Sequence, residues 1–119
     1  MKTPQERLEL VNRVSEHLLA QNKKSVNFWG SCLYRGPDGL KCAIGALLPD
    51  DTDFIRLENL PVSDPAVLAV LGVDVNDMET IGLLTQLQKM HDNGPIDTWA
   101  EGLTLIADNL ALIIADLGE

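Results

Sequence analysis

The chain of 119 residues is long enough to bury the core of one domain and too short for two, and its 45% content of apolar residues excludes a disordered protein. Aromatic residues make up only 4%, so the core has to be built from Leu, Ile, Val and Ala. No apolar run approaches the roughly 20 residues of a membrane-spanning helix, and the polar N-terminus does not resemble a signal peptide. We therefore expect a single cytoplasmic domain over residues 1–119.

The net charge of −9 is unevenly distributed. Residues 1–41 carry seven basic and four acidic side chains, whereas residues 42–119 carry two basic and fourteen acidic ones. Nucleic-acid binding needs a concentrated basic face, and the acidic part of the chain repels nucleic acid and anionic membranes alike. We therefore expect no direct binding to nucleic acid or membrane, and a basic protein partner remains compatible with this charge.

The first predicted element is an amphipathic helix. Thr3 can cap it, Pro4 suits the first helical position, and Glu6 stands where the second residue of a capping box is required. We expect the helix to fade at Gln21-Asn22. Apolar residues recur along it with helical spacing: Leu8, Leu10, Val11, Val14, Leu18 and Leu19.

Helical periodicity stops between Ser25 and Asp51. Cys32–Arg35 and Leu40–Ala43 flank the turn sequence Gly36-Pro37-Asp38-Gly39, which is typical of a type I turn that closes a hairpin with a bulge. We predict one short β-hairpin at about residues 32–43, packed against helices because an isolated hairpin is only marginally stable. The predicted fold class is therefore α+β, predominantly α-helical, with one small hairpin.

After the hairpin, caps and helix breakers divide the chain into further helices. Asp64 and Gly72 are the expected cap and stop of one of them, and Asn93-Gly94-Pro95 ends another. The expected helices are Ala43–Leu48, a short piece through Phe54–Leu57, Ala66–Leu71, and a longer helix from about Met78 to Asp92.

The last predicted helix, capped by Asp97, has a regular apolar seam. Its apolar residues recur at spacings of 4-3-4-3-4, which is typical of a helix packed along its whole length. The seam consists of Trp99, Leu103, Ile106, Leu110, Ile113 and Leu117. The same seam could serve a homodimer, and the sequence leaves both arrangements open.

The two cysteines, Cys32 and Cys42, lie on opposite arms of the predicted hairpin. A disulfide needs an oxidising compartment, which nothing in the sequence indicates. A zinc site needs about four ligands, and the available Cys and His residues, including His17 and His91, lack the spacing that arranges such ligands in advance. We therefore expect two small buried thiols, with no metal and no cofactor.

A dyad of Cys42 and His91 is the enzyme hypothesis that the residues allow. Cys42 precedes the predicted Ala43–Leu48 helix, whose amide dipoles would lower the thiol pKa, and His91 could act as the base. The sequence indicates no particular Asn or Asp as a third member. We therefore assign no catalytic residues and favour a protein that is not an enzyme.

A basic cluster is the most distinctive candidate site for ligand binding. It contains four of the nine basic residues: Lys23, Lys24, Arg35 and Lys41. Arg35 and Lys41 should face each other across the hairpin, and together with Tyr34 and Trp29 they could bind a small anion such as a phosphate or a nucleotide. The alternative is that these cations pair with acidic residues of the same chain. We favour that alternative because no phosphate-binding loop accompanies the cluster.

Four stretches of the chain carry a resemblance to known sequences. The first is a helix with the pattern QE…V..HLL.Q.KKS at residues 5–25, and the second is Cys32-x-Tyr-Arg-Gly-Pro-Asp-Gly-Leu-x-Cys-Ala-x-Gly-x-Leu-x-Pro-Asp50. The third is the Leu-Gln-x-x-His-Asp helix end at residues 87–92, and the fourth is the final helix led by Trp99. Together they resemble a recurring group of small, uncharacterised bacteriophage and prophage proteins. The segment Leu57–Val75 departs from this pattern. The resemblance implies a phage-borne cytoplasmic protein and implies no activity.

These observations favour a small acidic interaction protein of phage or prophage type that binds a host protein, for example to inhibit a host defence system. One alternative is a protein that binds or sequesters a small ligand through Trp29, Tyr34, Arg35 and Lys41. A second alternative is an enzyme that uses the Cys42–His91 pair.

Overall fold

The computed structural model describes residues 1–27 and 29–117, and within these residues it contains five α-helices, two short 3₁₀ turns and no strand. The elements in chain order are α1 (Pro4–Gln21), η1 (Pro37–Gly39), α2 (Phe54–Leu57), α3 (Pro65–Leu71), α4 (Met78–Asn93), η2 (Ile96–Thr98) and α5 (Trp99–Asp116).

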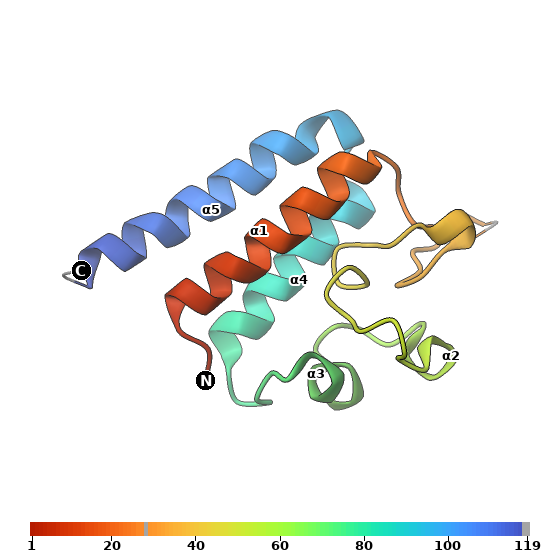
Figure 1. Ribbon diagram of the computed structural model, residues 1–119, viewed down its shortest axis with the longest axis horizontal. Coiled ribbons are helices and arrows are strands. Elements are labelled where there is room, and N and C mark those ends of the chain that lie inside the picture. The colour runs from red at the N-terminus through yellow and green to blue at the C-terminus, as the bar shows by residue number, and fades with distance from the viewer. Residues whose placement is uncertain (28, 118–119) are drawn as a thin grey trace.

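The three long helices, α1, α4 and α5, lie together on one side of the molecule, and the shorter elements occupy the other (Figure 1). α1 and α4 run in the same direction, and α5 returns antiparallel to them. The molecule measures 47 × 31 × 20 Å along its principal axes. Its shortest dimension is about two helix diameters, so the protein is flat and leaves much helical surface exposed.

α1 begins and ends as its sequence predicts. The Thr3 hydroxyl accepts the N–H of Glu6, and the Glu6 carboxylate accepts the N–H of Thr3, so the capping box is confirmed. The helix ends at Asn22, whose left-handed backbone directs its N–H back to the carbonyl of Leu18. The buried apolar stripe of α1 consists of Val11, Val14 and Leu18.

The predicted starts of α3 and α4 are also confirmed. Asp64 caps α3, which ends at Gly72 in the left-handed conformation that favours glycine. Asp77 caps α4 by accepting the N–H of Thr80, and it also accepts the N–H of Lys2 at 2.9 Å. The start of α4 is thereby tied to the N-terminus of the chain.

The β-hairpin predicted at residues 32–43 is wrong. The described part of the chain between α1 and α2 contains two isolated antiparallel bridges, Val26 with Cys32 and Arg35 with Lys41, and no strand. The fold is therefore mostly helical, without the β component that the sequence suggested.

Strand pairing stops after the Arg35–Lys41 bridge because the backbone groups of the next residue pair, Tyr34 and Cys42, are bound by other groups. The N–H of Cys42 donates to the carbonyl of Tyr34 at 3.4 Å, but the reciprocal bond of a strand pair is not made. The N–H of Tyr34 donates instead to the Glu58 carboxylate at 2.8 Å. The carbonyl of Cys42 accepts the N–H of Ala46, which starts a turn.

A helix side chain takes the place of a neighbouring strand at Lys41. The side-chain amide of Gln21, at the end of α1, accepts the N–H of Lys41 and donates to the carbonyl of Lys41, and both hydrogen bonds are 2.9 Å long. The backbone groups of Lys41 are thus satisfied without a sheet.

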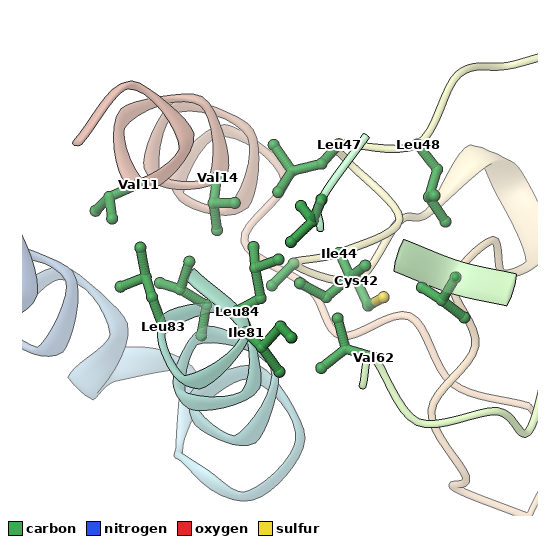
Figure 2. Close-up of a cluster of buried hydrophobic side chains, with 14 of the residues drawn as sticks. Val11, Val14, Cys42, Ile44, Leu47, Leu48, Val62, Ile81, Leu83 and Leu84 are labelled. Carbon is green, nitrogen blue, oxygen red and sulfur yellow. The ribbon is translucent and has the colours of Figure 1, made fainter. Parts of the chain in front are cut away.

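The helix predicted over Ala43–Leu48 is also absent, and hydrogen-bonded turns replace it. A Cβ atom on Gly45 would lie only 1.8 Å from the carbonyl oxygen of Tyr34, so this turn packs directly on the preceding backbone and only glycine fits. Figure 2 shows Ile44 and Leu47 of this segment in the same buried cluster as Val14 of α1 and Leu84 of α4. The core thus lies between the long helices and this irregular segment.

α5 packs on α1 over only part of its predicted seam. Trp99, Leu103, Ile106 and Leu110 are buried, whereas Ile113 is 46% and Leu117 is 55% exposed. The reason is visible in Figure 1, where the C-terminal end of α5 extends beyond the N-terminal end of α1. The predicted Asp97 cap is also wrong, since Asp97 lies inside η2 and no side chain caps the first turn of α5.

Candidate functional site

A cavity of about 290 Å³ lies between the Cys32–Cys42 segment, the loop after α2 and the C-terminal end of α4. The polar and sulfur-bearing side chains that line it come from all three of these parts. They include Cys32, Tyr34, Cys42, Glu58, Gln88 and Asp92. The fold therefore brings the cysteine-containing segment and the Gln88–Asp92 helix end together, although they are far apart in the sequence.

His91 lies behind this cavity and is fully buried. Its ring stacks on Trp99, with the ring centroids 5.4 Å apart. Its Nε2 is 3.1 Å from the backbone nitrogen of Ser25, and because a backbone N–H can only donate, Nε2 must be the acceptor. The neutral ring therefore carries its proton on Nδ1, which donates to the Asp92 carboxylate at 2.9 Å.

Asp92 accepts hydrogen bonds from two side chains, His91 at 2.9 Å and the Gln88 amide at 2.7 Å, and the Sγ of Cys32 lies within 4.8 Å of its carboxylate. Burial alone would raise the pKa of Asp92, but the interactions with His91, Cys32 and Gln88 outweigh it and hold the pKa below its ordinary value. Asp92 is therefore a carboxylate that organises its neighbours.

Both cysteines are held as thiols. Burial, followed by the hydrogen bond to Asp92, raises the pKa of Cys32 to about 12. Burial raises the pKa of Cys42 to about 12 as well, although its Sγ accepts the N–H of Gly45 at 3.2 Å. The side chain of Cys42 is fully buried. The low pKa of a nucleophilic thiol is therefore not produced at either position.

The predicted Cys42–His91 dyad has little geometric support within the described residues. Both ring nitrogens of His91 are used, one by Ser25 and the other by Asp92. The contacts of Cys42 are to the turn that follows it. The Sγ of Cys32 lies within 4.8 Å of donor atoms of both His91 and Asp92.

Arg35 and Lys41, predicted to bind an anion together, do lie together, and an acidic side chain of the same chain joins them. The Asp50 carboxylate is 2.8 Å from the Arg35 guanidinium and 3.7 Å from the Lys41 ammonium. The hydrogen bond from Arg35, followed by the charge of Lys41, lowers the pKa of Asp50. An external anion at this place would compete with Asp50.

The Arg35 guanidinium also stabilises the local backbone. It donates to the carbonyls of Gly45 and Leu48, and it lies 4.4 Å above the centre of the Phe54 ring. The hydrogen bonds fix the turn that replaces the predicted helix, and the contact with Phe54 joins this turn to α2. Arg35 therefore has a structural role whether or not a ligand binds.

The two aromatic members of the predicted ligand site occupy different environments. Tyr34 is buried, and its hydroxyl donates to the carbonyl of Leu60, so burial raises its pKa. Trp29 is 84% exposed, on a turn in which the Asn27 side chain accepts its backbone N–H. Tyr34 is therefore part of the core and lines the cavity, whereas the side chain of Trp29 faces solvent.

The structure adds residues that the sequence analysis did not select. Asp92 and Gln88 were visible only as parts of the Leu-Gln-x-x-His-Asp helix end, without an assigned role. Ser25 and Glu58 gave no signal, because one acts through its backbone N–H and the other as an acceptor for backbone groups 24 residues away.

The donor atoms of Cys32, His91 and Asp92 lie within 4.8 Å of one another, so this group is close enough to hold a metal ion. Coordination at Nδ1 would move the ring proton to Nε2, where it would meet the N–H of Ser25. Binding would break two hydrogen bonds, that of Nδ1–H to Asp92 and that of the Ser25 N–H to Nε2, and the Cys32 thiol would have to lose its proton. The three residue types are nevertheless ones that zinc accepts as ligands, so the donor set fits a metal by its chemistry.

One segment of the described chain, Ile96–Asp116, is long and apolar enough to cross a membrane by length and composition, with a mean hydropathy of 1.3 and 22% of it buried. Because this segment includes the core residues of α5, the same composition also suits a helix packed inside a protein. Comparison of the chain with models of protein families, with curated proteins and with solved structures finds no match.

Proposed function

We propose that the protein acts by binding another protein through the outer face of α5, as a small acidic interaction protein of phage or prophage type. Its partner is a protein of the host cytoplasm. The observation that carries the proposal is a pair of exposed leucines, Leu105 and Leu112, on a helix whose charged side chains are all acidic. Exposed apolar side chains rimmed by polar ones are typical of interaction sites.

The outer face of α5 alternates acidic and apolar residues. Glu101, Leu105, Asp108, Leu112 and Asp116 follow one another at spacings of three or four residues, which places them along one side of the helix. Leu105 is 59% and Leu112 is 66% exposed. The sequence of α5 contains no Lys, Arg or His.

Charge complementarity selects the chemistry of the partner. A surface with apolar residues flanked by Lys or Arg would bury Leu105 and Leu112 and neutralise the acids beside them. A second copy of α5 would instead bring like charges together, and an anionic lipid surface would be repelled. A basic protein surface is therefore the occupant to which the proposal commits.

Such a partner suits inhibition of a host defence protein. Defence proteins that act on nucleic acid carry basic sites, and carboxylates on a small folded protein can stand where phosphates would bind. The proposed mechanism is thus occupation of a basic site without any bond being made or broken.

The test begins with affinity purification of the chain from host cells at low and at moderate salt. We expect one protein partner in stoichiometric amount, with an association rate that falls as salt increases. Binding of the purified partner is then measured for the double variant Leu105→Gln/Leu112→Gln, which should bind at least about tenfold more weakly, because each buried anchor contributes about 1 kcal/mol or more.

Ile55→Gln is the matched control, because Ile55 is 91% exposed on α2, outside the proposed face, and should leave binding unchanged. Recovery of no stoichiometric protein at either salt would refute the proposal, as would equal binding by the α5 double variant. A dimeric mass in solution that the α5 variant abolishes would reassign the face to a homodimer. Sedimentation with vesicles would reassign it to a membrane.

A further inference from the structure

We propose that Cys32, Asp92 and His91 form a binding site for a divalent transition-metal ion, with Zn²⁺ as the best-fitting ion. The site lies at the wall of the cavity between the Cys32–Cys42 segment and the end of α4. This inference does not depend on the proposed function, because it concerns a different part of the molecule from the outer face of α5.

The donor atoms determine the class of metal. A thiolate sulfur, an imidazole nitrogen and a carboxylate oxygen are ligands that Zn²⁺ accepts together, whereas Mg²⁺ and Ca²⁺ require oxygen ligands. The three donor atoms lie within 4.8 Å of one another, and the Nδ1 of His91 and the Oδ1 of Asp92 are 2.9 Å apart. Neighbouring ligand atoms of a tetrahedral zinc ion lie roughly 3.4–3.6 Å apart, so Nδ1 and Oδ1 would have to move apart when the ion binds.

The surrounding residues already orient the ligands. The Gln88 amide fixes the Asp92 carboxylate through a 2.7 Å hydrogen bond, and stacking on Trp99 fixes the plane of the His91 ring. Cys32 is positioned by its bridge to Val26. Support of this kind for ligands is characteristic of metal sites.

The cavity gives the ion a route of entry and leaves room for a further ligand. Cys32 and Asp92 both line the cavity, and their side chains are partly exposed, whereas His91 lies behind them. Three protein ligands leave one position of a tetrahedral zinc ion facing the cavity, where a water molecule can complete the coordination. The ligands come from two segments that lie more than fifty residues apart, so no short sequence motif indicates the site.

Binding has a defined proton balance. The thiol proton of Cys32 is released to solvent as the sulfur binds the ion. The ring proton of His91 moves from Nδ1 to Nε2, and Ser25 loses its acceptor there. One proton is therefore released for each metal bound, and the affinity should increase with pH.

The first experiment titrates the reduced, metal-free full-length chain with Co²⁺ and then with Zn²⁺. We expect one Co²⁺ per chain, a thiolate-to-cobalt charge-transfer band in the near ultraviolet, and displacement of the band by Zn²⁺. The affinity should rise with pH from 6 to 8, as expected for loss of one proton. Absence of the charge-transfer band at pH 8 would overturn the proposal.

Variants assign the ligands. Cys32→Ser and Asp92→Asn should each weaken Zn²⁺ binding by at least about 100-fold, because loss of a ligand should cost at least as much as loss of an outer partner. Cys42→Ala is the matched control for the cysteine, and His17→Gln changes a histidine outside the proposed site; both variants should keep the band. Circular dichroism of each metal-free variant checks that it is folded, and Cys32→Ala replaces any Cys32→Ser protein that is not.

The thiol band also discriminates between sites. Loss of the band in Cys42→Ala with retention in Cys32→Ser would overturn the assignment, as would Zn²⁺ affinity that is unchanged in both Cys32→Ser and Asp92→Asn. Zn²⁺ should raise the melting temperature of the wild type and leave that of Cys32→Ser unchanged, because only a folded-state site shifts the unfolding equilibrium.

Discussion

The clearest test of how the irregular segment is built is the substitution Gly45→Ala. The added Cβ would lie 1.8 Å from the carbonyl oxygen and 2.7 Å from the carbonyl carbon of Tyr34, far inside van der Waals contact. The neighbour is backbone, so no side-chain rotation relieves the clash. The N–H of Tyr34 is bound by Glu58 and its carbonyl by the N–H of Cys42, which restrains it further.

The expected loss of stability combines two contributions. Overpacking in a well-packed core costs about 1–3 kcal/mol, and displacement of the Tyr34 carbonyl from the N–H of Cys42 costs about 1 kcal/mol more. We therefore expect Gly45→Ala to lower the free energy of unfolding by about 2–4 kcal/mol. At about 4 °C per kcal/mol for a domain of this size, the melting temperature should fall by about 8–16 °C.

Gly82→Ala is the matched control, because it is the same chemical change with the opposite expected sign. Gly82 is exposed in the middle of α4, and a Cβ there meets nothing within 4 Å. Alanine in an exposed helix is more stable than glycine by about 0.5–1 kcal/mol, so the melting temperature should rise by a few degrees.

The assay is urea denaturation followed by circular dichroism, supported by thermal melts of both variants. A midpoint that shifts without a change of slope reports stability alone. If Gly45→Ala unfolds at the same urea concentration as the wild type, the close approach of this turn to Tyr34 is not present in solution.

Three further predictions follow from caps, burial and ionisation. Thr3→Ala should destabilise the protein by about 1 kcal/mol, because the capping box of α1 is lost, and urea denaturation measures this directly. Leu103→Ala, at a fully packed position of α5, should cost about 2–5 kcal/mol, whereas Leu112→Ala on the exposed face should cost less than about 0.5 kcal/mol. Because hydrogen bonds lower the pKa of Asp92 below its ordinary value of 3.8, its stabilising contribution is complete above that pH and is lost as the pH falls through the folded-state pKa. The unfolding free energy of Asp92→Asn should therefore change less with pH below about 4 than that of the wild type, and equal acid dependence of the two proteins would contradict this role.

The helix boundaries could be predicted from the sequence because local residues determine them. Thr3 and Glu6 satisfy each other within one turn, and Asp64 and Gly72 act on the helix that they flank. Such signals need no knowledge of the rest of the fold. Periodicity also placed Trp99, Leu103 and the next two residues of the apolar seam of α5 in the core. It could not show that α5 extends beyond the N-terminal end of α1, which leaves Ile113 and Leu117 exposed.

The hairpin could not be predicted correctly because its competitors are distant in the sequence. The turn residues around Pro37 and Asp38 do form a tight turn, and the bridge between Arg35 and Lys41 forms beside it. The next pair fails because Glu58 captures the N–H of Tyr34. No local pattern contains that information.

The candidate metal site was missed for a related reason. Its ligands have no spacing that suggests a common site, since Cys32 comes from the irregular segment and the other two from the end of α4. The sequence analysis compared Cys42 with His91, whereas the fold brings Cys32 to Asp92. The sequence shows Asp92 beside His91, but it does not show that Cys32 lies next to them in the fold.

The irregular segment between α1 and α2 is therefore shaped by helix side chains rather than by its own strand pairing. Gln21 of α1 binds both backbone groups of Lys41, His91 of α4 accepts the N–H of Ser25, and Glu58 beyond α2 accepts that of Tyr34. Each acceptor belongs to a different element, so the segment reaches its structure only when those elements are assembled. A peptide spanning residues 22–53 should consequently show no hairpin in solution, and its Cys32 should not be preorganised for metal, because the groups that hold it are contributed by the rest of the chain.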